Sequence, residues 1–108
     1  MSRPQFLASL TSTAALVSNV PCRLEGVFAY NGSNATAFIQ LFDAAAAASV
    51  TVGTTAPVAV VGAATVTFMN APFTGGLRFV NGIVAAFTTT ATGSSNPSAA
   101  TSPTFVIS

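Results

Sequence analysis

The sequence predicts an all-β fold, a jelly-roll-like antiparallel β-sandwich with an extended N-terminal arm. Short runs rich in Val, Phe and Thr, which favour strands, recur along the chain. Gly, Asn, Ser and Pro turn signals separate these runs, and almost no helical pattern is present. About eight short strands in two sheets form a jelly roll, and a chain of 108 residues has room for one domain with one core.

The N-terminal segment, residues 1–20, is expected to be an arm or edge strand, and residues 21–108 a single sandwich domain. The segment is rich in Ser, Thr and Ala with spaced apolar residues, and a strand is expected near residues 14–20. Hydroxyl residues interrupt its apolar stretch, which makes a poor signal-peptide core. The uncharged stretch 44–77 contains Gly and Pro and alternates as strands do, so no membrane-spanning helix is expected.

Residues 22–30 alternate most regularly and form the clearest predicted strand. One face of this strand is expected to carry Cys22, Leu24, Gly26, Phe28 and Tyr30. The other face is expected to carry Arg23, Glu25, Val27 and Ala29. Arg23 and Glu25 then lie side by side, where they can pair with each other or across an interface.

A turn at residues 31–34 and a strand at 35–42 predict a hairpin with the preceding strand. Asp43 is a plausible N-cap for one helical turn in the run of five alanines that follows it, although a crossover between sheets is the favoured interpretation. A short strand is expected at 49–53, followed by a loop from Gly53 to Pro57.

The second half of the chain repeats this style. Gly62 separates two short predicted strands, Gly75 and Gly76 are expected to break the chain, and Asn81-Gly82 predicts the turn of a second hairpin. The expected strands of this half are residues 58–61, 64–69, 77–80, 83–90 and 104–107, with a loop at 93–102.

The scarcity of charge excludes most chemistry. Only five side chains are charged, and the chain has no His, no Lys and no Trp. No base is available to activate a nucleophile, and no Cys, His or carboxylate cluster exists for a metal, so we expect neither an enzyme nor a cofactor. Glu25 and Asp43 could in principle form the carboxylate pair of a glycosidase. The favoured alternative is that Glu25 forms an ion pair and Asp43 caps a turn. No basic stripe exists for nucleic acid.

So few charges cannot cover the surface of an ordinary soluble monomer, so other copies of this chain or a larger partner are expected to cover part of it. The residues expected to contact other copies or the larger partner are Arg3, Phe6, Arg23, Glu25, Tyr30, Thr54, Thr55, Phe73 and Arg78. The aromatic residues expected in the core are Phe28, Phe38, Phe42, Phe68, Phe79 and Phe87.

Several motifs give the chain a recognisable style. They are Gly26-x-Phe28-x-Tyr30-Asn31, residues 37–44 (AFIQLFDA), residues 52–57 (VGTTAP), Gly76-Leu77-x-Phe79-x-x-Gly82-Ile83 and Ala86-x-Thr88-Thr89-Thr90-Ala91-Thr92-Gly93. Over residues 24–93 this pattern resembles small virion proteins of tailed bacteriophages, of the capsid decoration or cement type. The motifs are structural and carry over no catalytic residues.

The resemblance implies a β-sandwich that works as a symmetric homo-oligomer, expected to be a trimer, on the surface of a phage capsid. Its partners would be other copies of itself and the major capsid protein, with no nucleic acid and no membrane. The alternative is a tail, neck or head-fibre module that binds a host surface or another virion protein.

Overall fold

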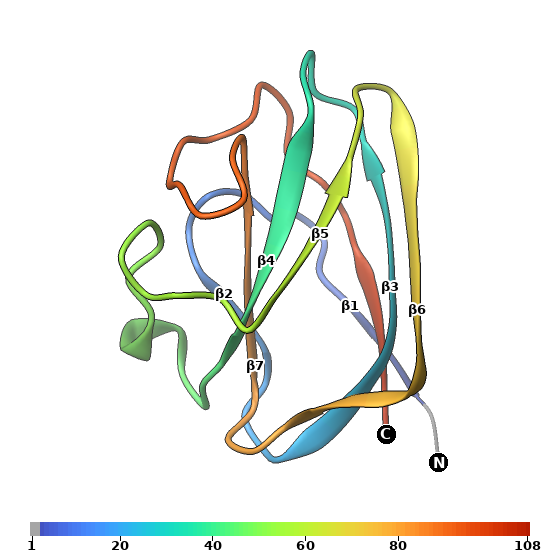
Figure 1. Ribbon diagram of the computed structural model, residues 1–108, viewed down its shortest axis with the longest axis vertical. Helices are drawn as coiled ribbons and strands as arrows, with labels where there is room; N and C mark the ends of the chain where they lie inside the picture. The colour runs from blue at the N-terminus through green and yellow to red at the C-terminus, as the bar shows by residue number, and fades with distance from the viewer. Residues whose placement is uncertain (1–2) are drawn as a thin grey trace.

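The computed structural model describes residues 3–108, and Figure 1 shows the course of the chain. Nearly all regular structure is β, as the sequence predicts, and the one short helix is a 3₁₀ turn. The elements are β1 (Arg3–Phe6), β2 (Ala15–Ser18), β3 (Cys22–Asn31), β4 (Ala37–Asp43), η1 (Ala47–Ser49), β5 (Ala59–Ala63), β6 (Thr67–Phe79), β7 (Ile83–Thr88) and β8 (Thr104–Ile107).

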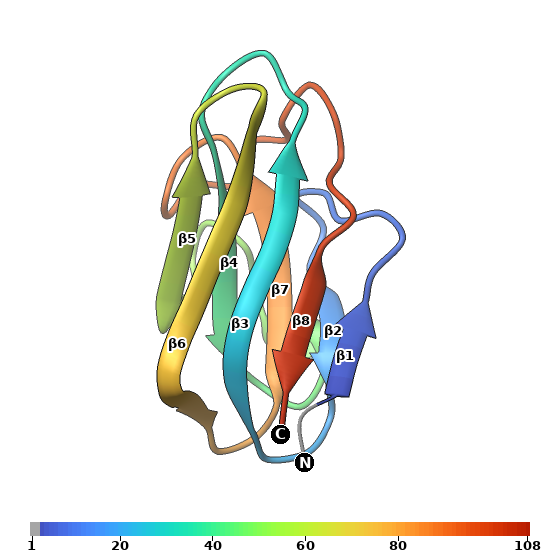
Figure 2. The same cartoon turned by 90° about the vertical axis from the view of Figure 1, so that its right-hand side faces the viewer.

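The strands form two four-stranded antiparallel sheets, in the orders β1-β8-β3-β6 and β2-β7-β4-β5 (Figures 1 and 2). Pairing joins β1 to β8, β2 to β7, β3 to β6 and β4 to β5, so the chain is a long hairpin rolled into two layers. This strand order is that of a jelly roll, which confirms the predicted fold class.

The N-terminal segment forms an edge strand of each sheet. β1 pairs with β8, and β2 pairs with β7. Leu10 and Val17, between and within these strands, are buried in the main core. Burial of apolar side chains therefore holds the expected arm against the sandwich, although residues 1 and 2 lie outside the described part.

Both predicted hairpins are wrong, because the turns connect strands of different sheets. Asn31 ends β3 in one sheet, and β4 begins at Ala37 in the other. The Asn81-Gly82 turn likewise leads from β6 into β7 across the sandwich. A jelly roll exchanges sheets at each of these connections, and local turn signals do not distinguish such an exchange from a hairpin.

Three expectations near Asp43 are also wrong. Asp43 is the last residue of β4, and η1 begins after Ala46 with no side-chain cap. The favoured crossover between sheets is wrong because β4 and β5 pair within one sheet. The strand expected at residues 49–53 is a loop, because this segment crosses the outside of a sheet instead of joining its edge. In the described chain, no helix is long and apolar enough to cross a membrane.

The expected break at Gly75 and Gly76 is instead part of a continuous β6. Both glycines have positive φ, at 82° and 80°, a region that other residues rarely adopt. They belong to residues 73–76, which lie opposite Glu25 alone, because Leu24 pairs with Leu77 and Gly26 with Pro72. Against β8, Glu25 is the one extra residue of β3, because Leu24 pairs with Ile107 and Gly26 with Val106. Such a bulge changes which face the following side chains occupy.

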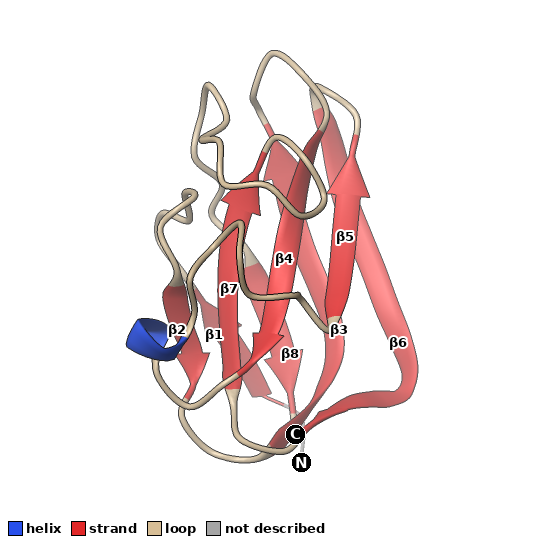
Figure 3. Cartoon of the chain, turned by 60° about the vertical axis from the view of Figure 1, so that its left-hand side comes forward, coloured by secondary structure: helices blue, strands red, loops and turns tan. Residues whose placement is uncertain are grey.

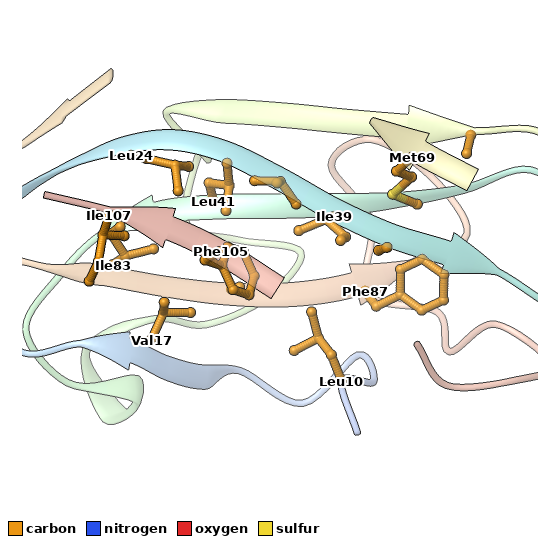
Figure 4. Packing of buried hydrophobic residues seen from close by; sticks show 14 of the residues in the cluster. Leu10, Val17, Leu24, Ile39, Leu41, Met69, Ile83, Phe87, Phe105 and Ile107 are labelled. Atoms are coloured by element: carbon orange, nitrogen blue, oxygen red, sulfur yellow. The ribbon is translucent and has the colours of Figure 1, made fainter. Parts of the chain in front are cut away.

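The main core lies between the two sheets (Figure 4). Its largest fully buried members are Leu10, Leu24, Val27, Ile39, Leu41, Phe79, Ile83, Phe87, Phe105 and Ile107. Phe42, Phe79 and Phe87 are buried as predicted, whereas Phe38 is only partly buried. Phe28 and Phe68 are exposed, so their assignment to the core is wrong.

Candidate interaction surface

The two sheets differ in what covers their outer faces. The segment after β4 crosses the outside of the β2-β7-β4-β5 sheet, where Phe42, Val50, Val84 and Ala86 form a second small core (Figure 3). Every residue of β7 is buried, because this strand is covered on both sides. The chain therefore covers the outer face of this sheet with its own loops.

Gln40 attaches a second loop to the same outer face. Its Nε2 donates to the hydroxyl of Thr88 at 2.7 Å and to the carbonyl of Gly93 at 2.9 Å. Gln40 is fully buried, so these bonds satisfy donors that have lost contact with water. The segment after β7 thereby closes over the ends of β4 and β7.

Among residues 3–108, no loop covers the outer face of the β1-β8-β3-β6 sheet, as Figure 2 shows. Strand alternation and register show which residues face outward, because their sequence neighbours enter the core. We call these residues the open face: Pro4, Phe6, Gly26, Phe28, Tyr30, Phe68, Asn70, Pro72, Thr104 and Val106.

Sheet register brings the aromatic residues of the open face together from three strands. Phe6 of β1 and Phe28 of β3 both lie opposite Thr104 of β8, on its two sides. Tyr30 lies opposite Phe68 of β6, and their ring centroids are 4.8 Å apart with planes inclined at 54°. This tilted contact is a favourable geometry for two aromatic rings.

A shallow hollow of about 430 Å³ lies on the open face. Its walls include Phe28, Tyr30, Phe68, Asn70 and Ser102. Phe28 does not stand upright beside it. A Cβ added at Gly26 would come within 3.1 Å of the Phe28 ring, so the ring lies back over that glycine. The Phe28 ring therefore forms one wall of the hollow and covers Gly26.

The open face exposes an unusual amount of aromatic surface. The exposed fractions are 62% for Phe6, 39% for Phe28, 40% for Tyr30 and 74% for Phe68. At roughly 200 Å² for a whole aromatic side chain, these four expose about 400 Å². No member of the open face is charged. Apolar patches of this size are often functional.

One end of the same sheet carries the charge that the open face lacks. Arg23 of β3 lies directly opposite Arg78 of β6, and both side chains are exposed. Arg23 packs its methylenes beside Gly76 and reaches the carbonyl of Gly75 at 3.5 Å. Like charges directly opposite each other in a sheet are unfavourable for folding by themselves.

The structure gathers most of the residues that the sequence singled out as contact residues. One sheet carries Arg3, Phe6, Arg23, Glu25, Tyr30 and Arg78. Phe73 also lies in β6, but its side chain is partly buried against the main core. Thr54 and Thr55 lie away from this sheet, in a turn where Thr55 Oγ accepts the N–H of Thr51 at 3.0 Å.

Sequence reasoning missed Phe28 and Phe68 as surface residues. Simple alternation along residues 22–30 places Phe28 on the same side as the buried Leu24. The extra residue at Glu25 reverses this relation, so that Val27 enters the core and Phe28 faces outward. The one available signal is Gly26 directly after a charged residue, because glycine within a strand often marks a bulge.

A second hollow, of about 400 Å³, lies at the end of β4, where Asp43 and Asn81 form part of its wall. The Asp43 carboxylate accepts the backbone N–H of Asn81 at 2.8 Å and that of Val80 at 3.0 Å. Partial burial by itself raises the pKa of Asp43, but hydrogen bonds from the backbone of Asn81, Val80 and Gly82 outweigh it and lower the pKa.

Asp43 is therefore a structural acceptor that holds the connection between β6 and β7. No other titratable side chain lines the hollow beside it. Glu25, the other carboxylate, belongs to the opposite sheet. Among residues 3–108, no group of three or more His, Cys, Asp or Glu side chains is placed to hold a metal ion.

Comparison of the chain with protein-family models, with curated proteins and with solved structures gave no match. Inferences about function therefore depend on the surface itself. The open face, with the Arg23–Arg78 pair at its end, is the largest exposed aromatic surface described above.

Proposed function

We propose that this chain is a structural virion protein, a decoration or cement protein that binds the outside of a phage capsid as a homo-oligomer and stabilises the shell. The observation that carries the proposal is the open face. A jelly roll that covers one sheet with its own loops and leaves the other apolar and uncharged is suited to assembly with other proteins.

The surface chemistry supports a structural part over a catalytic one. The described residues offer one isolated hydrogen-bonded Asp beside a hollow and no base near a nucleophile. In contrast, aromatic residues, which dominate the energetics of protein interfaces, are concentrated on the open face. The resemblance of residues 24–93 to small phage virion proteins points to the same class.

The mechanism would be burial of apolar surface at contacts repeated over a lattice. Each contact need not be strong, because a homo-oligomer that touches several shell subunits gains affinity through effective concentration. A shell subunit bridged to its neighbours in this way must break more contacts before it can leave, so the particle resists heat and expansion.

The test is the copy number of this chain in purified virus particles, measured by quantitative mass spectrometry against the major capsid protein. We expect a ratio near one, which would place the chain across the capsid lattice. A ratio far below one would move the chain to the tail, neck or fibres. Absence from purified particles would remove the virion assignment.

The alternative, a tail, neck or head-fibre module that recognises a host surface, has one observation in its favour. The hollow on the open face is lined by Tyr30, Phe68 and Asn70, and aromatic rings beside an amide could hold a sugar. Against it, Asn31 is fully buried, and its side-chain amide donates to the carbonyl of Ala63 at 3.0 Å. A glycan array with no hits would contradict this alternative.

A further inference from the structure

We propose that the open face is the surface through which two copies of this chain pair, sheet against sheet, about a two-fold axis that runs across the strands. In this arrangement β3 of one copy lies antiparallel over β3 of the other, and β6 over β6. The inference rests on the proposed function only in treating the open face as an assembly surface. The partner that it assigns to this surface is a second copy of the chain.

The available area suits a pair of copies. The four exposed aromatic residues offer about 400 Å², and Pro4, Pro72 and Val106 extend the apolar surface between them. A standard interface buries about 800 Å² on each partner. The four aromatic residues therefore supply about half of that area, and the uncharged residues between them and the Arg23–Arg78 pair extend it.

The charge pattern of β3 and β6 is complementary to itself. Arg23 and Arg78 form a cross-strand pair at one end of these strands, and Tyr30 and Phe68 form a cross-strand pair at the other end. Arginine stacks favourably on aromatic rings. A second copy of the chain can thus place its aromatic rings against the arginines at one end and its arginines against the rings at the other end.

This pattern selects one of the two ways in which a two-fold axis can join the faces. An axis parallel to the strands would place the arginine pair against the partner's arginine pair, which is repulsive. An axis across the strands places Arg23 over Tyr30 of the partner and Arg78 over Phe68 of the partner, and does so twice. Arg23 and Tyr30 are about 23 Å apart at roughly 3.3 Å per residue, so both ends are engaged together.

The pairing gives a dimer in place of the trimer expected from the resemblance. A three-fold contact joins two different patches, whereas the open face combines both complementary features on one patch. Self-complementarity of a single surface is the property of a two-fold interface.

The first experiment measures the mass of the full chain by sedimentation equilibrium from about 1 to about 100 µM. We expect a dimer, and we expect Phe68→Ser to weaken it by about 30-fold or more. Val58→Ser is the matched control, because Val58 is 57% exposed but lies in the loop before β5, away from the open face. Thermal unfolding of each variant shows that it remains folded.

A charge reversal tests how the ends meet. Phe68→Arg should abolish pairing, because it places a cation against Arg78 of the partner. The double variant Phe68→Arg, Arg78→Glu should regain part of the pairing, because the new carboxylate faces both Arg23 of its own chain and the new arginine of the partner. The two positions lie near opposite ends of β6, too far apart to neutralise each other within one chain.

Each other result overturns the inference. A monomer throughout the concentration range, or a trimer, removes the two-fold pair. A dimer that tolerates Phe68→Ser lies elsewhere on the molecule, and failure of the double variant to pair removes the antiparallel arrangement. Copy number in virus particles is measured independently, so a trimer found at capsid stoichiometry would leave the proposed function standing while this inference falls.

Discussion

The carboxylate of Asp43 joins two connections of the jelly roll. It ends β4 and accepts backbone N–H groups of the turn that leads into β7. Because these bonds favour the ionised form, the pKa of Asp43 is lower in the folded protein than in the unfolded chain. The corresponding stability is present above the ordinary pKa of Asp and is lost as pH falls through the folded-state value.

We therefore expect Asp43→Asn to lower the free energy of unfolding by about 1 kcal/mol at pH 7, since the carboxylate is partly solvated. The difference between wild type and variant should shrink below about pH 4. Urea unfolding at both pH values measures it. An equal difference at pH 7 and in acid would show that ionisation of Asp43 contributes nothing.

At Gly82, in the same turn, neighbouring backbone carbonyls come too close to leave room for a side chain. Its φ is 153°, and an added Cβ would come within 2.8 Å of the Ala44 carbonyl oxygen and would also strike the carbonyl of Ser18. Neither obstacle is a flexible side chain. The turn must therefore shift or open to accept any larger residue.

We expect Gly82→Ala to lower the free energy of unfolding by about 3 kcal/mol, in the range of severe backbone and overpacking changes. Gly75→Ala is the control, because a Cβ there meets nothing within 4 Å. It carries only the strain of a positive φ, about 1 kcal/mol. Denaturant unfolding of both variants should separate them, and similar losses would contradict the steric argument.

At the level of elements, the bulge at Glu25 decides which side of β3 enters the core. Val27 is fully buried, whereas Phe28 is 39% exposed. We expect Val27→Ala to cost about 2 kcal/mol of stability and Phe28→Ser less than about 1 kcal/mol. Chemical denaturation gives both values. The reverse order would mean that β3 follows simple alternation without a bulge.

How far the sequence predicts this molecule depends on the range of the interaction concerned. The sequence predicts the strands that begin at Cys22 and Thr104 with nearly the right bounds, because alternation and turn residues are local signals. It does not predict the neighbouring strands in the sheet, because β1 pairs with β8 across nearly the whole sequence. Hairpins were predicted at Asn31 and Asn81 for the same reason.

The candidate surface was predicted in part. Tyr30 and Arg78 were singled out as contact residues and do lie on the exposed side of one sheet. Phe68 was assigned to the core because it follows a predicted strand pattern. Whether a sheet face is covered depends on where distant loops lie, and the loop that covers β7 starts after a different strand.

At the scale of the whole molecule, the low charge determines how contacts respond to salt. The formal net charge is +1, and the open face has no charged member. Salt screens interactions between exposed charges but not the burial of apolar surface. Contacts through this face should therefore persist at high ionic strength.

We expect the self-association constant to change by less than about threefold between roughly 50 and 500 mM NaCl, and to increase in sodium sulfate, which strengthens apolar burial. Sedimentation equilibrium in each buffer measures this. The charge-reversed double variant serves as the contrast, because its ion pairs should weaken with salt. A steep salt dependence of the unmodified protein would indicate an ionic interface.

The pairing of β1 with β8 also sets the order of events on the ribosome. β1 is made first, yet its ladder partner appears only when residues 104–107 have been synthesised. Until then β1, with the aromatic Phe6 at its end, has no strand to pair with, and β2 likewise has no partner until β7 is made. The fold can therefore close only after translation has passed β8, and before that moment the growing chain is most open to aggregation.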